Sequence, residues 1–262
     1  MKIIITAGGT AEKIDKVRKI TNLATGKLGS LTAGEFVKQG GDRIEKIFYI
    51  CERGTIVPKL SCIEVVSTEG VNEVKDALSE LLTTYKIDAV IHSMAVSDYA
   101  VESMTTAEDL ALFLAHKLFL LNRQDFKQES SLTECITAWI KENDRLLDRN
   151  RKVGSDIRNL MLSMRQTPKL IGLIKTLQPS TVLVGFKLLN GVKKQRLLDA
   201  GYEVLVRNSC DLVLANDQSE IDGGRHIGFL LSPDRTFVRF QTKAEIANGI
   251  VGKVLHLIDK KG

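Results

Sequence analysis

Residues 1–29 read MKIIITAGGTAEKIDKVRKITNLATGKLG, and this stretch decides the fold. Residues 3–5 form a run of three isoleucines that leads into the turn 6–10, TAGGT. A β-branched run before a glycine turn is typical of the first strand of a parallel sheet, buried on both faces. Because Gly8 and Gly9 lack a Cβ, the backbone can approach a ligand closely there. The glycines do not have the GxGxxG spacing of dinucleotide-binding turns. Taken alone, they are therefore as consistent with helix packing as with ligand binding.

A second glycine turn, Thr25 to Gly29 (TGKLG), precedes an apolar segment from Ser30 to Val37. The spacing predicts a helix that starts near Gly26 to Ser30 and packs on the sheet. Free N–H groups at a helix start, next to Lys27, suit an anion. The loop between the two turns is too long for an ordinary strand-to-helix connection. We expect it to be functional, since it carries Asp15, Arg18 and Asn22.

The composition favours a globular α/β protein that acts on a small anionic molecule. The chain has 262 residues, of which 44% are hydrophobic, and a net charge of +5. This length supports one large domain, predicted to span 1–262. The basic residues are dispersed and aromatic residues make up only 5% of the chain. The chain therefore offers few aromatic side chains on which nucleic-acid bases could stack, and we expect no nucleic-acid partner.

The cysteines and the hydropathy pattern favour a cytoplasmic protein. The four cysteines, Cys51, Cys62, Cys135 and Cys210, are widely spaced and include no CxxC pair. We interpret them as reduced thiols, and those near apolar segments as core residues. The sequence has no signal peptide and no apolar run long enough for a membrane span. We therefore expect no membrane association.

Apolar runs alternate with helical patterns along the chain. The predicted strands after the first are residues 47–51, 63–66, 89–92, 182–186 and 212–215, and a terminal hairpin pairs 227–231 with 236–240. Residues 245–258 close the chain as an amphipathic helix. The alternation predicts an α/β fold with a doubly wound, mainly parallel sheet, and the hairpin would add antiparallel edge strands.

The segment from Val71 to Val153 contains neither glycine nor proline, so we expect it to be rich in helix. Residues 107–121 and 132–147 predict two helices joined by the polar segment 122–131. We interpret them as a helix-rich insertion at about 101–150. Such an insertion covers a site or an interface, or it is a packing appendage; both interpretations stay open.

Polar residues follow several predicted strands. Ser93 to Tyr99 (SMAVSDY) follow a central strand, where open α/β sheets bind ligands. Asp98 is a candidate ligand of a divalent cation or a ribose hydroxyl, or a helix N-cap. His92 is more often structural than catalytic in such a place. Lys152 has the reach to contact a phosphate, although a solvated lysine is the commoner case.

Two further strand ends carry polar groups, and several common catalytic motifs are missing. Phe186 and Lys187 offer an aromatic face and a cation, whereas Asn216 and Asp217 are more typical of turn caps. The sequence contains no HExxH motif and no cluster of cysteine and histidine, which argues against a zinc site. It also lacks GxSxG, so a hydrolase triad has no support.

The ordered set of these segments resembles the phosphopantothenate-cysteine ligases. The segments that carry the resemblance are ITAGGT (5–10), Asp15 to Arg18, Asn22 with TGKLG (25–29), MAVSDY (94–99), Lys152, TPKLI (167–171), VGF (184–186) and DLVLAND (211–217). Each segment alone is weak, but their order matches that of the family. The resemblance implies a Rossmann-like fold and a cytoplasmic homodimer.

The resemblance also implies the reaction. A nucleoside triphosphate activates the carboxylate of 4′-phosphopantothenate, and L-cysteine then forms the amide, in the pathway to coenzyme A. The chain looks like the bacterial members, which use CTP with Mg²⁺, while ATP is the alternative that eukaryotic members use. No flavin is expected, because the first strand begins at residue 2 and leaves no room for a preceding decarboxylase domain.

Site residues follow from the same resemblance, position by position. Asn22, Arg18 and Ala95 match residues that handle the activated acyl group, and Lys152 matches the lysine associated with forming it, where a cation offsets charge on the phosphates. The remaining matches are nucleotide-contacting positions: Gly8, Gly9, Gly26, His92, Ser93, Met94, Asp98, Pro168, Lys169, Leu170, Ile171 and Phe186. Asp98 is also the candidate Mg²⁺ ligand, through the triphosphate.

The sequence departs from the family pattern in four places. ATGKLG replaces the SSGKMG common in bacterial relatives, which keeps a hydroxyl. Lys152 is followed by Val153 and Gly154 instead of further lysines, and the excursion at 101–150 matches no family residues. Arg207 is only a candidate phosphate contact, since its spacing before DLVLAND differs.

Two other functions compete with the ligase. An NADP-dependent oxidoreductase would use the TAGGT turn and Tyr99, but the glycine spacing is wrong and Ser103 stands where a lysine would be expected. A non-catalytic nucleotide-binding regulator would use the helical insertion as its partner surface. It would bind ligand without turnover.

Overall fold

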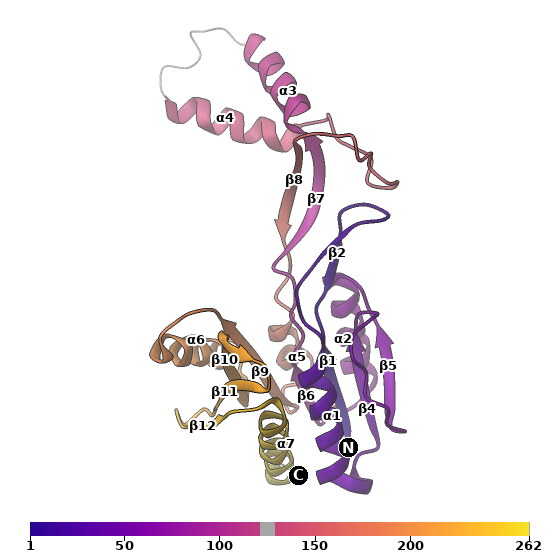
Figure 1. Ribbon diagram of the computed structural model, residues 1–262, viewed down its shortest axis with the longest axis vertical. Coiled ribbons are helices and arrows are strands. Elements are labelled where there is room, and N and C mark those ends of the chain that lie inside the picture. Colours follow the sequence, from indigo (N-terminus) through magenta and orange to yellow (C-terminus); the bar gives the residue numbers. More distant parts are fainter. Residues whose placement is uncertain (121–128, 262) are drawn as a thin grey trace. The chain divides into compact units, whose positions relative to one another are not determined.

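The computed structural model describes residues 1–120 and 129–261. It divides into two compact units (Figure 1): the first comprises residues 1–11, 21–97 and 168–262, and the second residues 12–20 and 98–167. The second unit reaches beyond the predicted insertion at 101–150 on both sides and includes part of the long N-terminal loop. The interpretation of the chain as one domain with an insertion stays a prediction.

The first unit contains an eight-stranded sheet in the order β12-β11-β10-β9-β6-β1-β4-β5. Its strands are β1 (Lys2–Ala7), β4 (Lys46–Cys51), β5 (Ile63–Ser67), β6 (Ala89–His92), β9 (Val182–Leu189), β10 (Leu212–Asp222), β11 (Arg225–Leu231) and β12 (Phe237–Phe240). The strands from β5 to β10 pair in parallel, and β11 and β12 add antiparallel pairs at one edge. The predicted doubly wound sheet and terminal hairpin are confirmed.

Strand β1 lies between β4 and β6, so the chain leaves it first toward one edge of the sheet and later toward the other. In doubly wound sheets this reversal opens a crevice at the carboxyl ends of the strands, where ligands bind. The topology therefore places the predicted turns after β1 and β6 at this crevice.

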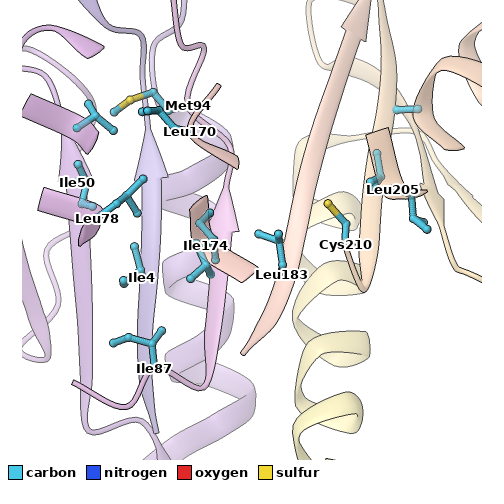
Figure 2. Close-up of a cluster of buried hydrophobic side chains, with 14 of the residues drawn as sticks. Ile4, Ile50, Leu78, Ile87, Met94, Leu170, Ile174, Leu183, Leu205 and Cys210 are labelled. Carbon is cyan, nitrogen blue, oxygen red and sulfur yellow. The ribbon is translucent and has the colours of Figure 1, made fainter. Parts of the chain in front are cut away.

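Helices cover both faces of the sheet. They are α1 (Lys27–Gly40), α2 (Val71–Thr84), α5 (Ile171–Leu177), α6 (Lys194–Arg207) and α7 (Lys243–Lys261), with a 3-10 turn at Gly41–Arg43. Ile3 and Ile5 of β1 pack with α1 and α7, while Ile4 packs with α2, α5 and α6 on the other face (Figure 2). Side chains of a strand alternate between faces, so the isoleucine run supplies both cores.

The second unit is built on an antiparallel ribbon of β7 (Tyr99–Thr106) and β8 (Leu160–Gln166). Helix α3 (Ala107–Phe119) follows β7 directly (Figure 1), and the Thr106 hydroxyl caps it by accepting a hydrogen bond from the Asp109 N–H at 3.0 Å. Helix α4 (Glu129–Glu142) follows later in the chain. Two short strands, β2 (Ala11–Lys13) and β3 (Lys19–Thr21), pair with each other in the long loop.

The prediction for this region was partly wrong. The two helices exist, but α4 ends at Glu142, five residues before the predicted end, and a turn follows in which the Asn143 side chain accepts a hydrogen bond from the Arg145 N–H. Strands β7 and β8 were missed, although Val101, Met104 and Thr105 are buried in the ribbon. Most of the predicted connection at 122–131 lies outside the described residues.

No helix in the described ranges has the length and hydrophobicity that a membrane crossing requires. The four cysteines are free thiols, and Cys51 and Cys210 are buried in the sheet core as predicted.

Candidate active site at the carboxyl end of the sheet

Asn22 and Ala95 meet directly at the ends of β1 and β6. The Asn22 side-chain amide donates a hydrogen bond of 2.9 Å to the Ala95 carbonyl. The Ala95 N–H donates to the Gly8 carbonyl at 2.8 Å, and the Thr10 N–H donates to the Ala95 carbonyl at 3.1 Å. Gly9 also pairs with Ala95 through an isolated parallel β-bridge. The structure thus brings together four residues that the sequence analysis named separately: Asn22, Ala95, Gly8 and Gly9.

The glycines of the two turns are required by local geometry. Gly8 has φ 79° and Gly26 has φ 76°, values that L side chains rarely adopt. A Cβ at either position would also collide with Thr55, in the loop after β4. At Gly9, a Cβ would lie 2.7 Å from the Asn22 carbonyl oxygen. The glycines therefore let the two turns and the Thr55 loop pack tightly and hold Asn22 beside β6.

A cavity of about 450 Å³ opens next to these turns, within the first unit. Its lining comes from the ends of β1, β6, β9 and β10, the start of α1, and the beginnings of β11 and α7. It includes Gly8, Gly26, Ser93, Met94, Ala95 and Phe186, all predicted site residues. Three lysines line it, Lys27, Lys187 and Lys243, and no aspartate or glutamate does among the described residues. This charge balance suits an anionic ligand.

Two buried polar side chains, Asn216 and His226, lie at the β10 and β11 side of the cavity. Asn216 Nδ2 lies 3.2 Å from His226 Nε2, while His226 Nδ1 has no hydrogen-bond partner in the described part of the chain. Burial, and to a smaller extent the charge of Lys243, lower the pKa of His226 to about 4. The imidazole is therefore neutral at pH 7.

His92 lies beneath the site and does not line the cavity. It is 7% exposed, and its Nδ1 lies 3.0 Å from the Thr6 hydroxyl. Burial lowers its pKa to about 4. Ser93 next to it donates from its hydroxyl to the Thr6 carbonyl at 2.7 Å, so this strand end is cross-linked to β1.

The segment 168–171 lies at the start of α5. Leu170 is buried in the core and Ile171 packs against it, whereas Pro168 and Lys169 are exposed. None of the four lines the cavity. The predicted nucleotide contacts of this segment stay predictions.

In the second unit, Asp15 joins Arg18 to the segment that carries Lys152. The Asp15 carboxylate accepts hydrogen bonds from Arg18 Nη2 at 2.6 Å and from the Val153 N–H at 3.1 Å. Arg18 Nη2 also donates to the Val153 carbonyl at 2.9 Å. These bonds hold the pKa of Asp15 well below its usual range, with the Arg18 side chain as the largest cause. These bonds join the loop that carries Arg18 to the segment that carries the exposed Lys152, 134 positions away in the chain.

Sequence reasoning missed Arg149, which organises the same unit. Its guanidinium donates to the carbonyls of Ile14 at 3.0 Å, Val101 at 2.7 Å, Glu102 at 2.9 Å and Lys13 at 2.6 Å. A single arginine in a polar stretch carries no pattern that predicts this. Asp98, at the start of the unit, is exposed, and its carbonyl accepts the Thr167 N–H at 3.0 Å.

Asp217 is a turn cap, as its sequence context indicated. Its carboxylate accepts the N–H groups of Gly191, Val192 and Ser219 at 2.8 to 2.9 Å. The sequence context also indicated a turn cap for the neighbouring Asn216, but this side chain lines the cavity instead. Within residues 1–120 and 129–261, no group of three acidic, cysteine or histidine side chains could hold a metal ion.

The geometry can be compared with known proteins. Residues 1–109 match the family model described as DNA/pantothenate metabolism flavoprotein C-terminal domain. This part of the chain is similar to that family. The match covers β1, the long loop, both glycine turns and the end of β6, which are the elements that form the Asn22 and Ala95 contact.

Curated relatives of this domain family are named coenzyme A biosynthesis bifunctional protein CoaBC. The protein of Thermococcus kodakarensis is 29% identical over 216 residues, 82% of this chain and 41% of the relative. That of Methanocaldococcus jannaschii is 25% identical over 260 residues, 98% of this chain and 51% of the relative. The chain therefore spans about half the length of the curated relatives it matches.

Solved structures of the family extend the similarity to the whole chain. A DNA/pantothenate metabolism flavoprotein from Streptococcus pneumoniae matches with a TM-score of 0.76 and 29% identity, covering 98% of this chain and 99% of the other. The C-terminal domain of a CoaBC protein matches with a TM-score of 0.65 at 18% identity, which shows the fold, over 99% of this chain and 96% of that chain. The family resemblance predicted from the sequence is confirmed.

Proposed function

We propose that the chain joins 4′-phosphopantothenate to L-cysteine in a reaction driven by a nucleoside triphosphate. The observation that carries the proposal is the contact between Asn22 and Ala95 at the carboxyl ends of β1 and β6, beside a cavity lined by lysines and free of carboxylates among the described residues. The family match and the coenzyme A biosynthesis relatives support it.

The proposed reaction has two steps. A carboxylate oxygen of 4′-phosphopantothenate attacks the α-phosphorus, the bond to the pyrophosphate oxygen breaks, and an acyl-nucleotidylate and pyrophosphate result. The cysteine amine then attacks the acyl carbon, the nucleoside monophosphate leaves, and the amine loses a proton. Both steps move negative charge onto phosphate oxygens, which fixed cations and N–H groups stabilise.

Each candidate residue has a proposed role in these steps. The Asn22 amide and the Ala95 backbone bind the acyl group, while Arg18 and Lys152 offset charge on the phosphates. The nucleotide contacts are the two glycine turns, residues 92–94, Asp98, the segment 168–171 and Phe186. Mg²⁺ would enter with the triphosphate, for which Asp98 is the candidate protein ligand.

CTP is the proposed nucleotide, and a cytoplasmic homodimer is the proposed form of the enzyme. These assignments follow the resemblance to bacterial members of the ligase family. The net positive charge of the chain fits the two anionic substrates, 4′-phosphopantothenate and the nucleoside triphosphate.

Replacing Asn22 with aspartate tests the proposal. Asn22→Asp removes the amide donor to Ala95 and places a negative charge beside the attacking carboxylate. We expect nucleotide binding to persist and amide formation to fall by at least about a hundredfold, the scale of losing one transition-state donor. The readouts are titration calorimetry with the nucleotide and mass spectrometry of the amide product.

The control is Asn190→Asp, which makes the same change at an exposed position outside the cavity lining. It should keep wild-type turnover. Undiminished product formation by Asn22→Asp would refute the role of Asn22.

A further inference from the structure

Thr10 lies between the two residues that form the contact at the candidate site, Asn22 and Ala95. Its backbone N–H donates to the Ala95 carbonyl at 3.1 Å, and its own carbonyl accepts a hydrogen bond from the Thr21 hydroxyl at 3.2 Å. The Ala95 carbonyl also accepts the Asn22 side-chain amide at 2.9 Å. Thr10 therefore bonds both to the residue before Asn22 and to the carbonyl that Asn22 contacts.

The Thr10 hydroxyl holds the chain on the other side of Ala95. It accepts the Ser97 N–H at 2.8 Å and donates to the Ser97 hydroxyl at 2.9 Å. Thr10 is fully buried and Ser97 is 8% exposed, so little water can reach these bonds and replace them. The N–H and the hydroxyl of a single residue thus bind the segment 95–97 at two points.

The start of the same segment is held by the other end of the glycine turn. The fully buried Thr6 hydroxyl accepts the Met94 N–H at 3.3 Å, and the Ala95 N–H donates to the Gly8 carbonyl at 2.8 Å. Segment 94–97 follows β6 and has no regular ladder of hydrogen bonds, so these bonds fix its position. Thr10 is the member of the turn that also bonds to the loop before Asn22.

We infer that Thr10 is a positioning residue for the proposed reaction, and that it acts through Ala95 on the Asn22 side chain. The inference rests on the proposed function, which gives Asn22 its role. Valine has the shape of threonine but replaces the hydroxyl with a methyl group. Thr10→Val therefore leaves the buried Ser97 N–H without its acceptor. The segment 95–97 shifts to satisfy this group, and the Ala95 carbonyl moves with it.

Steady-state kinetics of Thr10 variants in the full chain test the inference. Thr10→Val should lower kcat for amide formation by about tenfold or more, because a small misplacement of an orienting group slows the chemical step. The KM for the nucleotide should change by less than about twofold, since binding of the ground state does not depend on Asn22. Thr10→Ser keeps the hydroxyl and should restore most of the lost kcat.

Thr181→Val is the matched control. Thr181 is 1% exposed, and its hydroxyl donates to the Ile87 carbonyl at 2.7 Å. Both residues directly precede strands β9 and β6, so this bond lies at the amino ends of the strands, away from the candidate site. The substitution removes a buried hydroxyl in the same way and should keep the wild-type kcat. Thermal melts verify that each variant is folded at the assay temperature.

Combining Thr10→Val with Asn22→Ala shows whether Thr10 acts through Asn22. Asn22→Ala removes the amide that Thr10 positions, so the second substitution should lower kcat by less than a further twofold or so, about the error of such a cycle. Substitutions that act independently would instead multiply their effects.

Nuclear magnetic resonance of the Asn22 side-chain amide, without any substrate, gives a readout that does not depend on the reaction. The signal is assigned by its loss in Asn22→Ala. In the wild-type protein, in Thr10→Ser and in Thr181→Val, the bonded Nδ2 proton should exchange with water more slowly than the amide protons of the exposed Asn190. In Thr10→Val this difference should disappear.

A kcat of Thr10→Val equal to that of Thr181→Val would overturn the inference, and so would a multiplied loss in the double variant. Unchanged exchange of the Asn22 amide in Thr10→Val would overturn it as well. Failure of the proposed function looks different: the wild-type chain would form no amide with any nucleoside triphosphate, while the exchange rates would still show whether Thr10 positions Asn22.

Discussion

The geometry of the site depends on individual residues, and Gly26 is the clearest example. Its φ of 76° and the collision that a Cβ would make with Thr55 both exclude a side chain there. Gly26→Ala should therefore destabilise the protein by more than about 1 kcal/mol, the cost of a non-glycine residue in the left-handed region. Urea unfolding followed by circular dichroism measures this change.

Gly34→Ala is the matched control. Gly34 lies within helix α1, which begins directly after Gly26, and a Cβ at Gly34 would meet nothing within 4 Å. Alanine should raise stability by about 0.5 to 1 kcal/mol, because glycine is a poor helix former. Equal effects of the two substitutions would contradict the strain assigned to the turn.

The burial of His92 predicts how the free energy of unfolding changes as the pH falls. Burial lowers its pKa to about 4 in the folded protein, compared with 6.5 for an unperturbed histidine. As the pH falls below 6.5, His92 becomes protonated in the unfolded chain but stays neutral in the folded protein. The contribution of His92 to the free energy of unfolding is therefore fully present above this pH and is lost progressively toward pH 4. His226 contributes in the same direction.

The variant His92→Gln removes the contribution of His92 to this linkage. The urea midpoint of the wild-type protein should fall between pH 7 and pH 5, and that of His92→Gln should fall less. His116→Gln changes an exposed histidine of α3 and should keep the wild-type loss. A wild-type midpoint that stays constant over this range would contradict the burial argument.

At the scale of elements, the second unit depends on bonds between segments far apart in the chain. Asp15 is 3% exposed and joins the loop at 15–18 to Val153 through its carboxylate. Asp15→Asn would keep the size and shape of the side chain but weaken its hydrogen bonds to the Arg18 guanidinium. It would also replace one carboxylate oxygen, a hydrogen-bond acceptor, with an amide NH₂ group that faces N–H donors. We expect faster proteolytic cleavage within 144–156 and a higher KM for the nucleotide.

Limited trypsin digestion, read by mass spectrometry, checks the first expectation, and steady-state kinetics the second. Asp144→Asn is the control, because Asp144 is exposed and its side chain is not part of this network. The account of the network is wrong if the two variants are cleaved at the same rate.

The main elements of the sheet could be predicted because their patterns are local. The isoleucine run, the glycine turns and the hairpin at 227–240 each carry their signal within a few residues, and the structure has them where expected. Strands β7 and β8 could not be predicted in this way. Their register pairs Tyr99 with Gln166 across most of the second unit, and β8 is largely exposed, so its sequence lacks a clear apolar alternation.

The same distinction applies to the site. Asn22, Ala95 and the glycines lie beside turns that the sequence pattern predicts. Lys187, His226 and Lys243 line one cavity because the end of β9 and the beginnings of β11 and α7 lie at the same edge of the sheet. The sequence analysis noted Lys187 at the end of a predicted strand, but the spacing of single lysines and histidines does not predict that His226 and Lys243 lie at the same edge. Tertiary structure was needed to find these two.

At the scale of the whole molecule, the central claim is that this fold activates a carboxylate with a nucleoside triphosphate. Similarity to the Streptococcus pneumoniae structure covers 98% of the chain, so the elements that form the cavity and the ribbon fall within the shared fold. A binding protein or regulator of the same fold would hold the ligands but would not consume them.

The most direct measurement is pyrophosphate release by the full chain with Mg²⁺ and 4′-phosphopantothenate, tested with each of the four nucleoside triphosphates and without cysteine. The account predicts a burst of about one pyrophosphate per site with CTP, an acyl-cytidylate detectable by mass spectrometry, and steady turnover to the amide only after L-cysteine is added. No pyrophosphate with any of the four nucleotides, before or after cysteine, would contradict it.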